Sequence, residues 1–206
     1  MEGRLSRSAL LHGAGGLVVG VMLAGSATPA LAVPATPVSG NASLMTLLPA
    51  QAEIPDGLVE DGRRARSLAE VTQGFAQPAA AIRNFQTWGW IGNVICSFSL
   101  PKGTKPRSGM LNGVYVSIHE FTNADGARQG LDYALEGQKV GQPLHEAEVG
   151  SFGDYTRGLY GLLGYGYETT ILTQQGSLFI RVSAAMLDGD PTAKTQAIMA
   201  GILART

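Results

Sequence analysis

Two histidines, His119 and His145, remain once the first 32 residues are set aside, and each is followed directly by a glutamate. Paired histidine and glutamate side chains are possible metal ligands. His119 and Glu120 fall at the end of a predicted strand, where neighbouring side chains point to opposite faces, so they cannot hold one ion together. The sequence contains no HExxH or comparable motif. We therefore predict no metal and no cofactor, and histidines that are solvated or lie at a strand edge.

Nucleophilic catalysis has no recognisable motif in this chain. The sequence lacks a G-x-S-x-G elbow. The single cysteine, Cys96, alternates with apolar residues on a predicted strand, which is typical of a core residue. Four carboxylates could serve as acids or bases, but none forms an evident pair, and Asp190 fits better as a helix cap. They are Asp154, Glu168, Asp188 and Asp190. A hydrolase that uses such carboxylates or the histidines remains an alternative.

Aromatic residues offer a different chemistry, that of a binding surface. Segment 151–168 is rich in glycine and tyrosine, a composition that makes either adaptable binding surfaces or ordinary loops, and we interpret it as a connection. Its glycines lead into a strand rather than a helix, which excludes a phosphate loop. Phe85, Trp88 and Trp90 could form an aromatic ligand platform, but the helical spacing of the apolar residues in 79–88 favours packing against the sheet. The candidate ligand-binding residues are Trp88, Trp90, Tyr155, Tyr160, Tyr165 and Tyr167, grouped with the polar loop 101–113.

The amino end has the three parts of a secretory signal peptide. A positively charged start precedes the short apolar run 14–25, and an Ala-Leu-Ala sequence ends at Ala32. Ser26 stands where a lipoprotein would have its lipid-bearing cysteine. We predict a signal peptide over 1–32 and a secreted or extracytoplasmic protein cleaved after Ala32, with an uncleaved membrane anchor as the alternative. A flexible leader, 33–47, would then precede a single domain, 48–206.

Composition limits the partners. Without the first 32 residues the formal net charge is −2, which argues against nucleic acid as a ligand. One cysteine cannot form an internal disulfide, so the fold depends on packing alone. No later apolar run is long enough to span a membrane. The partners that remain are an unknown small ligand or a protein of the cell envelope.

The hydrophobic pattern predicts the elements that must position these residues. Apolar residues alternate with period two over 93–100, 113–121 and 167–184, the last segment turning at Gly176. A helix begins after the capping box of Ser67 and is interrupted at Pro78. Further helices follow the two hairpins. The order predicts an α+β fold, a mostly antiparallel sheet of two hairpin–helix units covered by helices, which is an α/β sandwich.

Several stretches resemble a loose group of exported bacterial proteins. They are the segments 48–64, 85–90 ("FQTWGW"), 116–135 ("VSIHEFTNADGARQGLDYAL"), 151–156 and 176–203. The group comprises small secreted or lipid-anchored proteins and the extracytoplasmic sensor-like domains of some bacterial kinases, some with PsbP-like α/β sandwich folds. The shared motifs are packing signatures, so the resemblance implies no functional residue. It implies a non-enzymatic binding or sensor-like domain; a secreted hydrolase or a structural envelope protein is the alternative.

Overall fold

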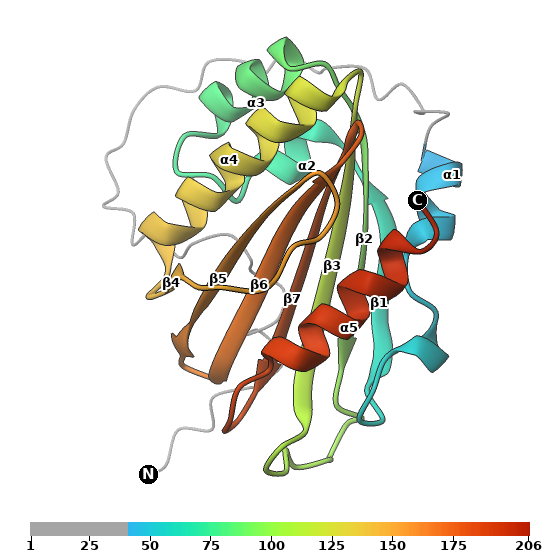
Figure 1. Ribbon diagram of the computed structural model, residues 1–206, viewed down its shortest axis with the longest axis vertical. Helices are drawn as coiled ribbons and strands as arrows, with labels where there is room; N and C mark the ends of the chain where they lie inside the picture. Colours follow the sequence, from blue (N-terminus) through green and yellow to red (C-terminus); the bar gives the residue numbers. More distant parts are fainter. Residues whose placement is uncertain (1–40) are drawn as a thin grey trace, which may run out of the picture.

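A single seven-stranded antiparallel sheet organises the computed structural model, which describes residues 41–206 (Figure 1). From one edge to the other the strands are β1 (Val59–Arg66), β2 (Trp90–Ser99), β3 (Leu111–Phe121), β7 (Leu178–Met186), β6 (Gly166–Gln175), β5 (Tyr155–Leu163) and β4 (His145–Glu146). Five helices and one short 3-10 helix complete the fold. The predicted α+β class, an antiparallel sheet covered by helices, is confirmed.

One face of the sheet is apolar and carries α1 (Asn41–Leu47), the 3-10 helix η2 (Gln51–Glu53) and α5 (Thr192–Leu203). The period-two alternation of β2, β3 and β7 supplies the strand side of this core, as predicted from the sequence. Its largest fully buried members include Leu58, Phe98, Leu111, Ile118 and Ile171. In Figure 1, α5 crosses in front of β7 and β3. Cys96 is fully buried in this core, which confirms its predicted place.

The opposite face carries α2 (Leu68–Thr72), α3 (Pro78–Thr87) and α4 (Ala124–Gly141), which gather at the upper end of the sheet in Figure 1. Phe85 and Leu131 of these helices pack on Phe121 and Phe179 of the sheet. The same face then becomes polar along β3 and β7. His119, Ser117 and Tyr115 of β3 pair with Phe179, Arg181 and Ser183 of β7. The helices therefore lie against the boundary between an apolar and a polar part of one sheet face.

Local signals place these helices as predicted. Ser67 accepts from the amide of Glu70 while the Glu70 carboxylate accepts from the amide of Ser67, which is a complete capping box. Pro78 is the first residue of α3, where its missing amide hydrogen costs nothing. Asn123 caps α4 through its side-chain oxygen. Each helix thus begins at a residue that satisfies or removes a free backbone donor.

One interpretation from the sequence needs correction. The segment expected to be a connection is strand β5 up to Leu163, paired along its length with β6. Its glycines hide the strand pattern because the segment before it crosses directly over them. A side chain at Gly158 would meet Ala147 and Val149, and one at Gly161 would meet Pro143 and Leu144. The two hairpin–helix units are present as predicted, β2–β3 followed by α4 and β6–β7 followed by α5, with the two helices on opposite faces of the sheet.

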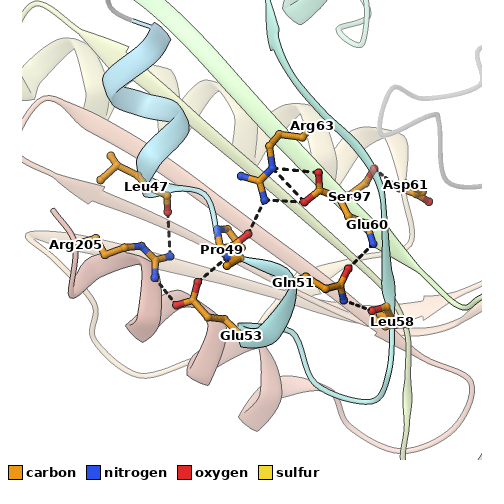
Figure 2. Close-up of polar contacts among 11 residues, drawn as sticks. Leu47, Pro49, Gln51, Glu53, Leu58, Glu60, Asp61, Arg63, Ser97 and Arg205 are labelled. Carbon is orange, nitrogen blue, oxygen red and sulfur yellow. Dashed lines mark hydrogen bonds and ion pairs between the residues drawn. The ribbon is translucent and has the colours of Figure 1, made fainter.

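The first described residues are attached to the end of α5 and to β1 (Figure 2). Arg205 donates to the Leu47 carbonyl at 3.0 Å and to the Glu53 carboxylate at 2.5 Å. Arg63 of β1 donates to the Pro49 carbonyl at 2.7 Å. We call these three contacts, together with the apolar packing of Leu44, the N-terminal clamp. The expected flexible leader therefore overlaps α1 from Asn41 on, and the expected signal peptide lies outside the described residues.

Candidate functional site

A cavity of about 90 Å³ opens between the polar part of the sheet face and the helices α2, α3 and α4. Its walls are of two kinds. The apolar lining consists of Val71, Phe75, Phe85, Ala134 and Phe179. The polar lining consists of Arg66, Tyr115, Ser117, His119, Gln138, Gln142 and Arg181. Within residues 41–206, no aspartate or glutamate belongs to the lining, so the charge at the cavity is positive.

Two guanidinium groups supply that charge, Arg66 from β1 and Arg181 from β7. Both side chains are half-buried, and neither forms an ion pair with a carboxylate in the described part of the chain. Burial lowers the pKa of Arg66, and the charge of Arg181 acts in the same direction. A buried cation is ordinarily paired with an anion. Among residues 41–206, Glu70 acts on Arg66 only from a distance, and it is itself paired with Arg64.

Neutral groups hold Arg66 in place. Its Nε donates to the side-chain oxygen of Asn93 at 2.8 Å, and its Nη2 donates to the Ser117 hydroxyl at 3.3 Å. Asn93 is fully buried and donates in turn to Ser117 and to the Ile118 carbonyl, both at 2.9 Å. Asn93 therefore fixes both Arg66 and Ser117. The guanidinium still has its Nη1 hydrogens to donate.

Arg181 is held in a similar way. Its Nε donates to the Ser183 hydroxyl at 3.0 Å, and its guanidinium lies 5.3 Å from the Tyr115 ring centre. The Gln138 amide, turned so that its oxygen faces Arg181, accepts from Nη1 at 2.8 Å. Ser183 continues through the Thr170 hydroxyl, 2.6 Å away, towards a carboxylate on β6. These partners leave Nη2 of Arg181 without a partner among the described residues.

A chain of three hydrogen-bonding groups sets the proton positions beside the two arginines. Trp90 Nε1 lies 3.3 Å from His119 Nδ1, and His119 Nε2 lies 3.1 Å from the Ser117 hydroxyl. The indole N–H can only donate, so Nδ1 must accept. The neutral ring then carries its hydrogen on Nε2 and donates it to Ser117. Trp90 therefore determines the tautomer of His119.

Ser117 becomes a donor to the cavity as a result. Its two lone pairs accept from Asn93 at 2.9 Å and from His119 at 3.1 Å, and Arg66 approaches the same oxygen at 3.3 Å. None of these three partners offers an acceptor to the Ser117 hydrogen, while the side chain lines the cavity. Three strands thus direct donors to one place: Arg66 from β1, Ser117 from β3 and Arg181 from β7.

The Ser117–His119 contact differs from a nucleophile and its general base. A base must accept the serine proton on the facing nitrogen. Here that nitrogen, Nε2, already carries the hydrogen because Trp90 occupies Nδ1. Burial, together with the charges of Arg66 and Arg181, keeps the pKa of His119 well below 6.5, so the ring stays neutral. The arrangement is suited to holding an anion rather than to activating a serine.

The two histidines occupy different environments, and the expectation of solvated or strand-edge histidines holds for one of them. His145 is exposed on the two-residue edge strand β4. His119 is only 5% exposed and stacks on the Phe179 ring at 5.0 Å. The solvated interpretation of His119 was wrong because α3 and Trp90 cover the strand end that the sequence left open. Across residues 41–206, no three His, Cys, Asp or Glu side chains are grouped to hold a metal.

The predicted ligand-binding aromatics do not meet in one place. Trp88 and Trp90 lie partly buried in the helix-covered core, and Trp88 contacts Phe85 and Tyr133. Tyr155 lies at the same end of the sheet, with Arg128 stacked on its ring. The remaining three lie towards the opposite end of the sheet. They are Tyr160 and Tyr167, whose rings stack at 5.9 Å, and Tyr165, whose carbonyl accepts from Asn112.

Two of these six contact a residue of the cavity: Trp90 donates to His119, and Trp88 packs on Phe85. Tyr165 is tied to Glu168 by a 2.5 Å hydrogen bond, and burial together with that carboxylate raises its pKa. Ligand binding by the tyrosines stays a prediction. The residues that sequence reasoning missed are Arg66, Asn93, Ser117 and Arg181. One signal was present: Arg181 interrupts the apolar run "LFIRVSA" of a central strand, where a charged residue needs a reason.

A second hollow, of about 390 Å³, lies beside β4 and β5 and is more open than the first. Of its three charged side chains, Glu146 and Arg157 form an ion pair with each other, and Lys139 pairs with Glu146 as well. The third, Glu148, is exposed to solvent, so the one cation of this hollow already has an anionic partner. The cavity that contains Arg66 and Arg181 is the stronger candidate for a ligand site.

Comparison with known proteins places the fold. No protein-family model matches the chain, and no curated protein matches it. Among solved structures, it is similar to the crystal structure of the extracellular domain of PknH from Mycobacterium tuberculosis, with a TM-score of 0.51 and 12% sequence identity. The match covers 77% of this chain and 92% of that domain. At this identity the likeness shows a shared fold, which agrees with the expected resemblance to kinase-linked extracytoplasmic domains.

Proposed function

We propose that this chain is an extracytoplasmic, non-enzymatic binding domain whose ligand is a small anion held by Arg66 and Arg181. The observation that carries the proposal is the pair of half-buried guanidiniums at one cavity with no described carboxylate in its lining. Water alone compensates a buried positive charge poorly, whereas an anion accepts charge-assisted hydrogen bonds from both groups. The Ser117 hydroxyl adds a third donor.

Two further findings support the extracytoplasmic part of the proposal. The fold is shared with a domain described as extracellular. Within residues 41–206, no helix combines the length and apolar character that a membrane crossing requires. A sensor-like role follows from the same fold, because a domain that closes helices over a ligand can report its presence. The signal peptide predicted from the sequence belongs to the same proposal.

The test is an NMR titration of the ¹⁵N-labelled protein with sodium acetate and with sodium phosphate, at constant ionic strength set by sodium chloride. We expect the amide signals of Ser117, His119 and Arg181 to shift and to saturate with at least one of the two anions. Arg181→Met removes one guanidinium, and we expect it to weaken binding at least tenfold. Arg66→Lys keeps the charge but loses the bond to Asn93, and we expect an intermediate loss.

Arg64→Met is the matched control. Arg64 lies on β1, two residues before Arg66, but it is exposed and paired with Glu70 at 2.6 Å. Its removal changes the net charge by the same amount and leaves the cavity intact. We expect binding within twofold of the unmodified protein. Equal losses in Arg64→Met and Arg181→Met would show a diffuse charge effect and overturn the proposal. Failure of both anions to shift the three amides would overturn it too.

A further inference from the structure

The cavity is asymmetric in a way that limits the chemistry of its ligand. The two arginines and Ser117 lie on the sheet side, on β1, β3 and β7. On the helix side the lining is mostly apolar, from Val71, Phe75, Phe85 and Ala134, with the amides of Gln138 and Gln142 at the end of α4. Phe179 extends this apolar surface onto the sheet, under the His119 ring. A ligand that fills the cavity must therefore be anionic at one end and apolar at the other.

This arrangement favours a carboxylate over a tetrahedral oxyanion. Phosphate and sulfate carry oxygens in all directions, so some would face Phe85 and Val71 without a hydrogen-bond donor, which is costly. A carboxylate carries both oxygens at one end and presents carbon at the other. Its two oxygens also match the paired N–H groups of a guanidinium. We infer that the ligand is a short-chain aliphatic monocarboxylate, an inference that rests on the proposed anion-binding function.

The size of the cavity limits the length of the acid. The cavity, of about 90 Å³, is small and open on one side, which limits the acid to a chain of a few carbons, such as acetate, propionate or butyrate. Formate would leave the apolar side empty. A longer chain would have to leave through the mouth of the cavity. Affinity should therefore rise from formate to propionate as the chain covers Phe85 and Ala134.

The experiment compares the dissociation constants of formate, propionate, phosphate and neutral propionamide, measured from the Ser117 and Arg181 amide shifts at constant ionic strength. We expect propionate to bind at least tenfold more tightly than phosphate and at least threefold more tightly than formate. Propionamide has nearly the same shape without the charge, and we expect no saturable shift. Ala134→Leu fills the apolar side, so it should weaken propionate more than formate.

The outcomes separate this inference from the proposed function. Phosphate binding as tight as propionate would overturn the carboxylate assignment and leave anion binding in place. Formate binding as tight as propionate would overturn the role of the apolar wall. If no anion shifts the amide signals of Ser117 and Arg181, both proposals are overturned. An Ala134→Leu protein that keeps its melting temperature and still prefers propionate over formate by the original ratio would contradict the placement of the chain against α4.

Discussion

The indole Nε1 of Trp90 and the imidazole Nδ1 of His119 lie 3.3 Å apart, and the indole donates across that distance. We predict that ¹⁵N–¹H correlation spectra of the histidine rings show His119 with an unprotonated Nδ1 and a protonated Nε2. Trp90→Phe keeps an aromatic ring but removes the donor, and we expect a mixture of tautomers and a loss of about 1 kcal/mol of stability. A protonated Nδ1 in the unmodified protein would contradict the donor role assigned to Ser117.

The buried imidazole also predicts how stability changes with pH. The pKa of His119 is held well below 6.5 by burial and by the two arginines, whereas the ring of the unfolded chain binds a proton near pH 6.5. The unfolded state therefore binds more protons, and the free energy of unfolding falls as the pH drops below about 6.5. The slope from this group is at most about 1.4 kcal/mol per pH unit.

Urea unfolding at pH 7.5, 6.5 and 5.5 measures this slope. We expect the unmodified protein to lose more stability over this range than His119→Gln, which has no ring to protonate. His145→Gln removes an exposed imidazole and controls for the loss of a histidine as such. Parallel pH dependence in the unmodified protein and His119→Gln would show that the buried ring is not the group responsible.

Cys96 should be inert while the protein is folded. Burial raises the pKa of its thiol to about 12, and the side chain is fully enclosed by the core. The thiolate is the reactive form, so we expect no reaction with a thiol reagent at pH 8 until denaturant unfolds the chain. Cys96→Ala/Ser151→Cys moves the single thiol to an exposed position and should react at once. Rapid labelling of the folded native protein would contradict the placement of Cys96.

Gly158 is required because the segment before β5 crosses over it. A Cβ at this position would lie 2.5 Å from the Ala147 carbonyl oxygen. We expect Gly158→Ala to lower the free energy of unfolding by about 1–3 kcal/mol, the usual cost of overpacking. Gly164→Ala is the matched control, since Gly164 has open space around it, and should change stability by less than about 0.5 kcal/mol. Equal losses of stability in the two variants would show that the segment before β5 does not pack tightly over Gly158.

The N-terminal clamp predicts a local change in hydrogen exchange. Arg205→Met keeps most of the aliphatic stem but loses the bonds to Leu47 and Glu53. We expect amides of segment 44–54 to exchange several-fold faster, while those of β3 and β7 keep their rates. Arg107→Met, in the exposed loop between β2 and β3, serves as the matched control. If amide exchange in Arg205→Met becomes faster by the same factor throughout the sheet, the substitution destabilises the whole protein instead.

The period-two alternation of apolar residues in the strands and the capping residues of the helices made most of the fold predictable. The alternation of Val114, Val116 and Ile118 identifies the buried face of β3 because one face of the sheet is apolar throughout. The capping box at Ser67 marks the start of α2 in the same direct way. Strand β5 escaped because its alternation is broken at Gly158, and the reason for that glycine is a crossing segment distant from any local pattern.

The candidate site was much less predictable, for a physical reason. Its donors come from residues as far apart as Arg66 and Arg181, and only the strand order β1-β2-β3-β7 brings them to one face. Asn93 looks like an ordinary polar strand residue until both partners are known. Trp90 was predicted to contact a ligand, whereas in the structure its indole donates to His119. A single sequence does not show which strands pair in the sheet, and this pairing decides which residues meet at the site.

The N-terminal clamp also has a consequence in time. The hydrogen bond between Arg205 and Leu47 joins residues 158 positions apart, so it forms only when α1 and α5 have both been placed on the sheet. Closing so long a loop costs entropy that the packing of the strands between the two residues must offset. We therefore expect the clamp to close late in folding, after those strands have paired.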